Sequence, residues 1–575
     1  MSYQEEYQKW LQSPALCEAA KEELRAIAND SKEIKERFYG PLEFGTAGLR
    51  GTMHVGLHNM NVHVIKWATQ AFAEVILAEG EAAAKKGVAI DFDCRHHSEE
   101  FARAAASVLA ANGISVRIFD ALRPTPEVSF AVRQYGCIAG INVTASHNPA
   151  EYNGYKVYWS DGAQLPPQHA AMVAKKMSEI DIFNDIKEIA FEDGIKEGRI
   201  TIMNYETDEE FLRNVLAMSN DAKLVHTIRD SFKIVYTPFY GCGYKMIPEV
   251  LRRIGMKNIY CEPQQMIIDG DFPTVKSPNP ENPEGFYLAV ELARKVGADF
   301  ILGSDPDADR VGIMVKNDQE EFIPLSGNQT GALFLEYYID ALKRNHRMPE
   351  QPVALKSIVS TDLVRKIAET NGVTLYDTFT GFKFMAEKKN QLEAAKEGHV
   401  IWAFEESYGY MVGDYVRDKD AVTACMLMTE MAAYYASRNM TIYQALGALY
   451  KKYGNYAEKT LNLVMPGLDG VEKMRALMKN LREHPLTEIA DEKIIIRKDY
   501  KDGTLEYVET CKKEPMELHD SNVLEYVLAD GSKILVRPSG TEPKVKVYIL
   551  IQGATMISCK ERCAKFAAWA ESLKN

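Results

Sequence analysis

The feature that most constrains this chain is a pattern that recurs three times: an apolar strand, a helix that ends at a glycine, and a second β-rich run. The copies begin at residues 87–93, 232–238 and 353–360, with the sequences GVAIDFD, FKIVYTP and VALKSIVS. Helices that end at glycine and lead into β-rich runs are typical of βαβ units with mostly parallel sheets. We therefore expect an α/β protein with three similar mixed-sheet α/β domains.

Each copy continues through a further helix to one more strand and then an unusual polar loop. These loops read TASHNP (144–149), SDPDADR (304–310) and FEESYGY (404–410). In α/β sheets, ligands bind beyond the carboxyl ends of the strands, so the three loops are expected to converge on one cleft. The alternative is three unrelated surface loops.

The C-terminal part has a different pattern. Residues 524–552 predict a hairpin with an Asp530-Gly531 turn followed by another strand, and an amphipathic helix is expected from about 554 to 573. This is a small α+β domain. The chain of 575 residues is too long for one core. We place the domains at 1–208, 209–320, 321–455 and 456–575.

Composition excludes several classes of protein. The 68 basic and 81 acidic residues give a formal charge of −13, which argues against nucleic-acid binding. No apolar run reaches the roughly 18 residues of a membrane span, and the N-terminus has no secretory signal pattern. Nine cysteines without C-x-x-C spacing favour reduced thiols, so a cytoplasmic location without a membrane partner is expected.

The SDPDADR loop is the strongest candidate for a metal site. Asp305, Asp307 and Asp309 alternate along it, and three carboxylates this close repel one another unless a cation lies between them. An EF-hand is excluded because Arg310 stands where that loop needs glycine and Lys316 where it needs glutamate. Mg²⁺ favours a few carboxylates plus a phosphate oxygen, so we predict Mg²⁺ with one coordination place left for a phosphoryl group. The alternative is an acidic surface turn.

The TASHNP loop places Ser146 beside His147 at the end of a strand, which suggests a nucleophile. The G-x-S-x-G turn of hydrolases is absent. Lys156 is a cation near this serine, and Arg50, in the glycine-rich FGTAGLRG stretch (44–51), is a candidate phosphate contact. Taken singly, each basic residue fits a surface charge better than a ligand.

Two further sets of residues suit a sugar phosphate. The LVRPSGTEPK stretch (535–544) offers a guanidinium, two hydroxyls and backbone N–H groups to a phosphate, although it is no Walker loop. The carboxylate and hydroxyl of the FEESYGY loop suit vicinal sugar hydroxyls, and cations occur in the nearby TGFK and RDKD stretches. The residues concerned are Arg537, Ser539, Gly540 and Thr541 for phosphate, Glu405 and Ser407 for sugar, and the cations Lys383, Arg417 and Lys419. An ordinary polar turn and a solvated acidic loop are the alternatives.

In their order along the chain, TASHNP, DPDADR and RPSGTEP resemble the α-D-phosphohexomutase superfamily over nearly the whole length. The resemblance implies three α/β domains and a C-terminal α+β domain, arranged like a heart around a central cleft. It implies that Ser146 is the phosphoserine that donates and recovers the phosphoryl group and that it binds Mg²⁺ together with the aspartate triplet. His147 and Lys156 match residues implicated in proton handling, with acid and base unassigned.

The resemblance also implies the remaining site. Arg50 is placed with the catalytic residues. Arg310 joins the substrate-binding set together with Glu405, Ser407, Lys383, Arg417, Lys419, Arg537, Ser539, Gly540 and Thr541. The FEESYGY loop departs from the G-E-x-S-G-H form of bacterial phosphomannomutase/phosphoglucomutases, and it looks more like the branch of bacterial α-phosphoglucomutases and animal phosphopentomutase-like enzymes.

The expected reaction is the interconversion of α-D-glucose 1-phosphate and glucose 6-phosphate through a phosphoserine and glucose 1,6-bisphosphate, which also serves as activator. One Mg²⁺ per chain, a lid motion of the fourth domain, and a monomer or weak dimer are expected. Within the same chemistry, mannose and pentose phosphates or a sugar-bisphosphate synthase are alternatives. From other classes come a non-catalytic sugar-phosphate binding protein and a metal-dependent phosphatase.

Overall fold

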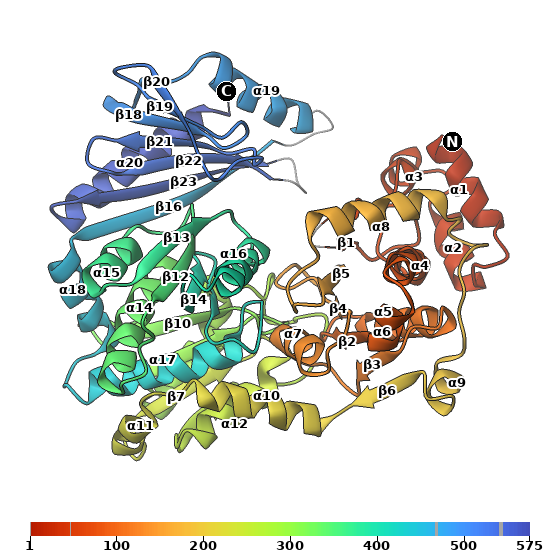
Figure 1. Cartoon of the computed structure of the whole chain (residues 1–575), viewed down its shortest axis with the longest axis horizontal. Coiled ribbons are helices and arrows are strands. Elements are labelled where there is room, and N and C mark those ends of the chain that lie inside the picture. The colour runs from red at the N-terminus through yellow and green to blue at the C-terminus, as the bar shows by residue number, and fades with distance from the viewer. Residues whose placement is uncertain (1, 46–47, 466–469, 540–543, 575) are drawn as a thin grey trace. The chain divides into compact units, whose positions relative to one another are not determined.

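The computed structural model describes residues 2–45, 48–465, 470–539 and 544–574 (Figure 1). The chain divides into two compact units. The first unit comprises Met1–Leu325, Lys389–Gln391 and Ser407–Thr441, and the second comprises Ser326–Lys388, Leu392–Glu406 and Ile442–Asn575.

The first copy of the repeat forms the centre of a six-stranded sheet in the first unit. Strand β2 (Val88–Phe92) pairs in parallel with β3 (Val116–Phe119) and with β4 (Ala139–Val143). Helix α6 (Ser98–Ala111) connects β2 to β3, and α7 (Thr125–Gln134) connects β3 to β4. The third strand of the copy therefore lies beside the first.

The second copy has the same topology in a five-stranded sheet of the same unit. Strand β7 (Lys233–Thr237) pairs in parallel with β8 (Asn258–Cys261) and β9 (Phe300–Ser304). Helices α12 (Gly243–Arg253) and α13 (Tyr287–Val296) make the two connections. All residues of β2, β4 and β9 are buried, as expected for parallel strands covered by helices on both faces.

The third copy, in the second unit, repeats this order. Strand β12 (Pro352–Ser357) pairs in parallel with β13 (Thr374–Thr378) and β14 (His399–Glu405), and the connecting helices are α15 (Leu363–Asn371) and α16 (Phe382–Ala395). The predicted threefold repeat of α/β domains is confirmed. Each unusual polar loop follows the third strand of its copy, so the three loops occupy equivalent positions.

Antiparallel strands follow two of these loops and make the sheets mixed, as predicted. Strand β5 (Tyr152–Trp159) runs back beside β4, and β10 (Val311–Lys316) runs back beside β9. An antiparallel return needs no crossover helix. The serine and aspartate loops are therefore short connections whose two ends are both anchored in a buried sheet.

The remaining elements complete the two units. In the first unit they are α1 (Tyr3–Gln12), α2 (Glu18–Ala26), α3 (Ser31–Phe38), β1 (Leu49–Thr52), α4 (Val62–Ala78), α5 (Glu81–Lys86), α8 (Pro167–Glu179), α9 (Phe191–Lys196), β6 (Ile200–Met203), α10 (Tyr205–Ala217), α11 (Ala222–Ile228), the 3₁₀-helix η1 (Pro283–Phe286), β11 (Phe322–Pro324), β15 (Gly409–Met411) and α17 (Ala421–Ala436). In the second unit they are α14 (Gly327–Arg344), α18 (Ile442–Tyr453), β16 (Asn455–Val464), α19 (Gly470–Glu483), β17 (Glu488–Ile489), β18 (Glu492–Asp499), β19 (Thr504–Tyr507), β20 (Lys512–Pro515), β21 (Leu524–Leu528), β22 (Lys533–Pro538), β23 (Lys544–Gly553) and α20 (Met556–Ser572).

The C-terminal sheet has the strand order β16-β23-β22-β21-β18-β19-β20, with β17 paired to β18. The predicted hairpin is confirmed: β21 pairs antiparallel with β22, and Gly531 in the turn has a φ of +86° that favours glycine. Helix α20 lies close to the predicted 554–573 and packs on β16 and β23. A C-terminal α+β domain therefore completes the predicted four-domain fold class, while the heart-shaped arrangement stays a prediction.

Within the second unit, the C-terminal sheet packs on the third α/β domain. An apolar cluster joins the two: Ile358, Val359 and Phe379 come from the third α/β domain, and Tyr500, Val523, Leu535, Tyr548 and Leu550 come from the C-terminal domain. An ion pair of 2.5 Å between Lys533 and Asp362 lies across the same boundary. The lid motion expected of the fourth domain stays a prediction.

Glu458 on β16 gives the second unit a pH-dependent stability. Burial raises the pKa of Glu458 to about 7 from 4.5, against a hydrogen bond from Thr361 and with a smaller contribution from the Asp362 carboxylate. The folded state therefore holds this proton more tightly than the unfolded chain, and stability falls as the pH rises through this window. We expect Glu458→Gln to raise the free energy of unfolding at pH 8 by about 1–2 kcal/mol.

Urea unfolding at pH 5 and pH 8 checks this prediction, with the exposed Glu561→Gln on α20 as the matched control. The gain should appear at pH 8 and nearly vanish below pH 5. An equal effect of the two substitutions at pH 8 would contradict it.

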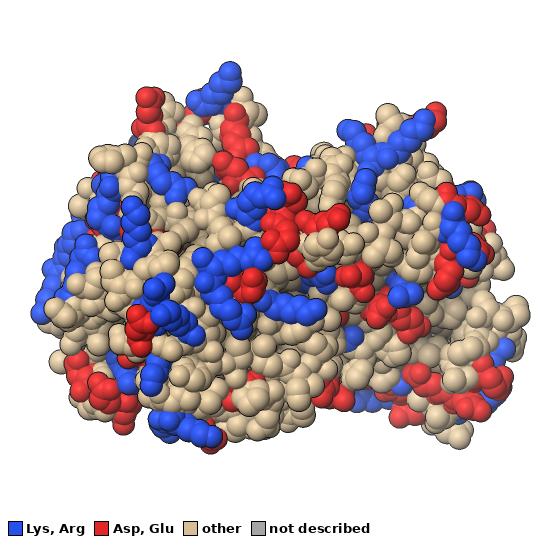
Figure 2. All heavy atoms as spheres, turned by 90° about the horizontal axis from the view of Figure 1, so that it is seen from below, with Lys and Arg blue, Asp and Glu red and all other residues tan. Residues whose placement is uncertain are grey.

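Surface charges of both signs are interleaved on the face drawn in Figure 2. Many lie on helices as pairs four residues apart, such as Glu99 with Arg103 and Asp340 with Arg344. Exposed pairs of this kind contribute roughly 0.3–0.5 kcal/mol each, so they balance charge more than they stabilise the fold. Among the described residues, no helix has the length and apolar character needed to cross a bilayer.

Candidate active site and metal centre

Ser146 lies in the connection between β4 and β5 with a left-handed backbone, at a φ of +54°. Its N–H donates to Thr144 Oγ1 at 2.8 Å, and its hydroxyl donates to Asp305 Oδ2 at 3.1 Å. The hydroxyl also lies 3.2 Å from His147 Nδ1. A left-handed conformation costs a non-glycine residue roughly 1–2 kcal/mol, so the surrounding contacts must hold the loop in place.

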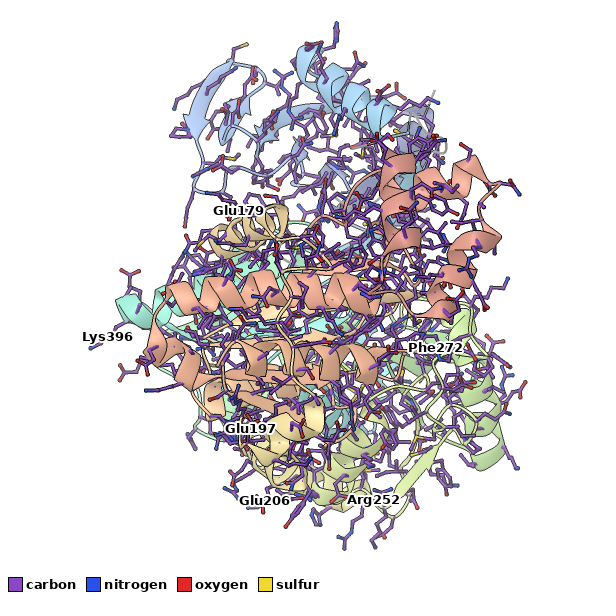
Figure 3. All side chains as sticks on the ribbon, turned by 90° about the vertical axis from the view of Figure 1, so that its right-hand side faces the viewer. Glu179, Glu197, Glu206, Arg252, Phe272 and Lys396 are labelled. Atoms are coloured by element: carbon purple, nitrogen blue, oxygen red, sulfur yellow. The ribbon has the colours of Figure 1, made fainter. Side chains whose placement is uncertain are left out.

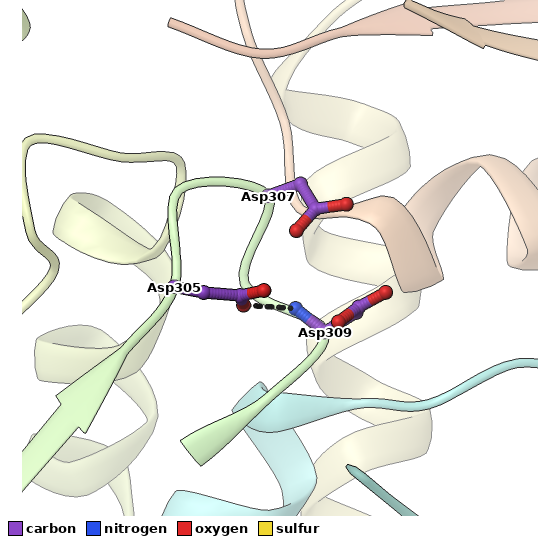
Figure 4. A group of neighbouring side chains, drawn as sticks. All are labelled: Asp305, Asp307 and Asp309. Atoms are coloured by element: carbon purple, nitrogen blue, oxygen red, sulfur yellow. Dashed lines mark hydrogen bonds between the residues drawn. The ribbon is translucent and has the colours of Figure 1, made fainter. Parts of the chain in front are cut away.

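The aspartate loop follows β9 and turns back at Ala308, whose φ is +51° (Figure 4). One carboxylate oxygen from each of Asp305, Asp307 and Asp309 lies within 4.8 Å of the others, and all three side chains are buried. Asp305 Oδ1 accepts the N–H of Asp309 at 3.1 Å, as the dashed line in Figure 4 marks. The serine and the triplet thus meet in one place.

Two carboxylate oxygens of the triplet, Asp307 Oδ1 and Asp309 Oδ1, are buried without a hydrogen-bond donor among the described residues. A buried polar atom left unpaired costs free energy, and carboxylate oxygens are the ligands that Mg²⁺ prefers. The arrangement fits a divalent cation, so the three carboxylates could hold the predicted metal.

The electrostatics of the triplet are uneven. Burial raises the pKa of Asp305 well above its usual value, and the neighbouring charges of Asp307 and Asp309 raise it further. Burial alone would also raise the pKa of Asp307, but the Lys156 ammonium, 2.7 Å from its Oδ2, holds it well below the usual range. Asp307 is therefore ionised at neutral pH, whereas Asp305 needs a further cation to become so.

Two lysines flank the triplet. Lys156 on β5 reaches Asp307 and also lies 3.6 Å from Asp309 Oδ2, while Lys419 lies 3.1 Å from the same oxygen. Burial lowers the pKa of Lys156, but the two carboxylates more than offset this and raise it above its ordinary value. Lys156 is therefore a fixed positive charge at neutral pH. Lys419, predicted to bind the substrate, forms an ion pair with Asp309, and its role in substrate binding stays a prediction.

His147 is electrostatically different from Lys156. Its pKa is held well below the usual value by burial in the loop and by the nearby charges of Arg310 and Arg50. The imidazole is therefore neutral at pH 7 and can accept a proton. Its backbone carbonyl accepts the Ser277 hydroxyl at 2.9 Å.

Two of the four predicted arginines, Arg50 and Arg310, lie close to the serine loop or the aspartate triplet. Arg50 on β1 is exposed and donates to Asn148 Oδ1 at 3.1 Å. Arg310 Nη1 lies 3.3 Å from a Glu281 carboxylate oxygen, and its Nε lies 3.6 Å from Asp309. The structure thus brings Arg50 and Arg310 together with Ser146 and the metal triplet.

Arg417 is bound by protein groups. It is 2% exposed, its Nε donates to Asn390 Oδ1 at 2.9 Å, and its Nη1 donates to the Asp414 carbonyl at 2.9 Å. Its backbone N–H donates to Ser129 Oγ at 2.9 Å. Through these bonds Arg417 links several segments of the first unit. Its predicted contact with substrate stays a prediction.

The sugar and phosphate candidates of the second unit form a separate set. Glu405, at the end of β14, accepts the Gly381 N–H at 2.6 Å. Burial lowers the pKa of Lys383, and the Arg537 charge lowers it further against an opposing effect of Glu387. The positive charges of Lys383 and Arg537 are therefore near enough to repel one another.

Arg537 on β22 donates to the Tyr548 hydroxyl at 3.3 Å, and the Ser539 N–H donates to the Lys544 carbonyl at 2.8 Å. Gly540 and Thr541, predicted in the same loop, lie outside the described residues. Ser407 is half-buried in the first unit, whereas Glu405 belongs to the second. The structure thus gathers Glu405, Lys383, Arg537 and Ser539 in one unit.

Sequence reasoning missed the residues that support the two loops. Thr125, at the start of α7, donates through Oγ1 to Asp307 Oδ2 at 2.9 Å and through its N–H to the Asp307 carbonyl at 2.8 Å. Asn142 donates to the same hydroxyl at 2.7 Å.

A glycine also allows close packing against the aspartate loop. A side chain built on Gly241 would meet Pro306 at 2.3 Å, so glycine is needed where these two segments come together. One pattern in the sequence could have indicated such supporting residues: polar side chains directly after a buried strand, such as Asp93 and Arg95 after β2.

Four domain families match the chain in order: phosphoglucomutase/phosphomannomutase α/β/α domains I, II and III and the C-terminal domain. The matched residues are 41–182, 209–319, 326–453 and 461–549.

Curated relatives and a solved structure agree with these matches. The phosphoglucomutase of Staphylococcus haemolyticus is 32% identical over 515 residues, covering 90% of this chain and 91% of that protein. The phosphoglucomutase of Staphylococcus aureus strain N315 is 34% identical over 524 residues, covering 90% and 91%. Parafusin, a phosphoglucomutase from Paramecium in an open form, superposes with a TM-score of 0.66 at 19% identity, covering 92% of this chain and 96% of that one. The chain belongs to the phosphoglucomutase/phosphomannomutase family.

Proposed function

We propose that this isomerase interconverts α-D-glucose 1-phosphate and glucose 6-phosphate, with Ser146 carrying the phosphoryl group between the two positions. As a family member, the enzyme transfers phosphoryl groups within sugar phosphates. One observation carries the assignment of the nucleophile: the Ser146 hydroxyl lies 3.1 Å from Asp305, in a triplet with unpaired buried carboxylate oxygens. Glucose is chosen because the curated relatives are phosphoglucomutases.

The reaction has two mirrored transfers. In the first, a hydroxyl oxygen of the sugar monophosphate attacks the phosphorus on Ser146, the P–Oγ bond breaks, and glucose 1,6-bisphosphate forms. The bisphosphate then turns end for end, and Ser146 Oγ takes the other phosphoryl group while the sugar oxygen regains a proton. A bound Mg²⁺ would neutralise charge on the serine phosphate. Phosphoryl transfer depends mainly on such positioning and charge neutralisation.

Proton handling falls to His147 in this proposal. Its neutral imidazole, 3.2 Å from Ser146 Oγ, can take the proton of the attacking hydroxyl and return it in the reverse step. Lys156 keeps its proton beside Asp307, so it supplies a fixed charge for the transferring phosphoryl group. Arg50, bound to Asn148 of the serine loop, and Arg310, 3.6 Å from Asp309, add two guanidinium groups.

The non-reacting phosphate needs a second site, because the bisphosphate carries a phosphate at each end. We assign it to Arg537 and Ser539, with Gly540 and Thr541 as further contacts from the same stretch of sequence. The charges of Lys383 and Arg537 act on one another, and Glu405 in the same unit supplies a carboxylate for sugar hydroxyls. Ser407, Arg417 and Lys419 complete the proposed substrate set.

We also infer a cytoplasmic location and small-molecule sugar phosphates as the partners of the enzyme. All nine cysteines are free thiols, which suits a reducing compartment.

Coupled assays with glucose 1-phosphate, mannose 1-phosphate and ribose 1-phosphate, each with Mg²⁺ and a trace of the matching bisphosphate, test the substrate. We expect the highest kcat/KM for glucose 1-phosphate, because a site that hydrogen-bonds sugar hydroxyls discriminates between sugars by roughly 10-fold or more. A higher value for mannose or ribose would reassign the substrate, and net release of inorganic phosphate would indicate a phosphatase.

A further inference from the structure

We propose that Arg95 is a positioning residue that holds the serine loop in the geometry needed for phosphoryl transfer. The inference rests on the proposed function of Ser146. Arg95 follows β2, and its side chain is fully buried. Its side chain donates hydrogen bonds to backbone carbonyls of the loop, so it would act through the loop and not on the substrate.

The guanidinium of Arg95 binds four carbonyl oxygens of one short segment. Nη2 donates to the carbonyls of Ser146 at 2.6 Å and Asn148 at 2.5 Å. Nη1 donates to the carbonyls of Pro149 at 2.8 Å and Tyr152 at 3.0 Å. A planar guanidinium presents five N–H donors in a fixed arrangement, so one side chain fixes the whole turn.

The guanidinium is itself held from two directions. Its Nε lies 3.2 Å from Asp93 Oδ2, and Asp93 Oδ1 accepts both the Arg95 N–H at 3.0 Å and the Ser98 hydroxyl at 2.7 Å. On another side the ring of Phe272, labelled in Figure 3, lies 5.1 Å from the guanidinium carbon. Phe272 is buried and belongs to the segment between β8 and η1. The segments that follow β2 and β8 therefore both hold Arg95.

This clamp matters because Ser146 is held in an unfavourable backbone conformation, at a φ of +54°. Without the guanidinium, four carbonyls lose a donor, the loop loses the side chain that ties them together, and it can relax towards ordinary backbone angles. Transfer to a sugar hydroxyl needs in-line alignment at the phosphorus, and a misplacement of about 1 Å can cost roughly 100-fold in rate. Substrate binding uses other residues, so kcat should change and KM should not.

The test compares Arg95→Ala and Arg95→Lys with the parent enzyme, each preloaded with glucose 1,6-bisphosphate and checked for serine phosphate by intact mass. We expect kcat for glucose 1-phosphate to fall about 100-fold in Arg95→Ala, with KM within about threefold. Arg95→Lys keeps the charge beside Asp93 but cannot reach four carbonyls, so it should lose at least about 10-fold. Guanidinium chloride at tens of millimolar should restore part of the Arg95→Ala activity, whereas ammonium chloride should not.

Arg37→Ala is the matched control, because Arg37 is also buried and ion-paired in the first unit, with Glu23 and Glu33. It should lower the melting temperature and leave kcat unchanged. If Arg95→Ala does not fold, Arg95→Lys carries the test. A parent-like kcat in a folded Arg95 variant, or a loss confined to KM, would overturn the proposal. A parent enzyme that never acquires a serine phosphate would overturn the proposed function instead.

Discussion

Ser146→Ala should abolish the interconversion of the two glucose phosphates, lowering kcat by roughly 10³-fold or more. The variant lacks the oxygen that forms and breaks the bond to phosphorus. Among the described residues, no other hydroxyl takes the place of the Ser146 hydroxyl, which lies 3.1 Å from Asp305. Alanine meets the same backbone strain at a φ of +54° as serine does, so the fold should persist. The melting temperature should stay within a few degrees of the parent.

Intact-mass analysis measures the cause of this loss. The parent incubated with glucose 1,6-bisphosphate should gain about 80 Da, the mass of one phosphoryl group, and the variant should gain nothing. Ser107→Ala on α6 is the control, since Ser107 is a buried serine outside the loop, and it should label and turn over like the parent. Labelling of Ser146→Ala, or activity close to that of the parent, would reject Ser146 as the phosphoryl carrier.

The sequence was sufficient to predict the repeat and the positions of its loops. Apolar runs such as 87–93 and 232–238 are bounded by glycine and polar residues. A short apolar run of this kind is typical of a strand that is covered by helices on both faces, so these segments could be assigned as strands. The third strand of each copy could be recognised in the same way. The aspartate triplet was also predictable, because alternate carboxylates between two buried strands have few uses other than binding a cation.

The support of the loops could not be predicted, because it depends on contacts between distant parts of the chain. Thr125 and Asp307 lie 182 positions apart, and their hydrogen bond leaves no local pattern. Arg95 binds backbone carbonyls, which every residue type offers. The protein partners of Arg417 were equally unforeseeable: its guanidinium donates to Asn390 and to the Asp414 carbonyl, while its predicted place in the substrate-binding set stays a prediction.

Asp307→Asn should lower kcat by roughly 10²-fold or more and should weaken Mg²⁺ activation in parallel. The substitution removes one anionic ligand and leaves the buried Lys156 ammonium without the carboxylate 2.7 Å away. Removal of the metal with EDTA should abolish the activity of the parent enzyme, and added Mg²⁺ should restore that activity. Activity titrated against free Mg²⁺ gives the apparent affinity of both proteins, and Asp120→Asn, which removes a carboxylate paired with Arg123 at the surface, is the control.

Charge balance explains why these carboxylates should need a metal ion and not simply the two lysines. Lys156 and Lys419 together offset two of the three negative charges, and burial, together with the charges of Asp307 and Asp309, raises the pKa of Asp305. Phosphorylation of Ser146 adds a charge of about −1.5 to −2 beside Asp305. A divalent cation would balance this excess and allow Asp305 to ionise. If the lysines alone sufficed, the parent would keep its activity in EDTA and Asp307→Asn would lose stability without any change in its response to Mg²⁺.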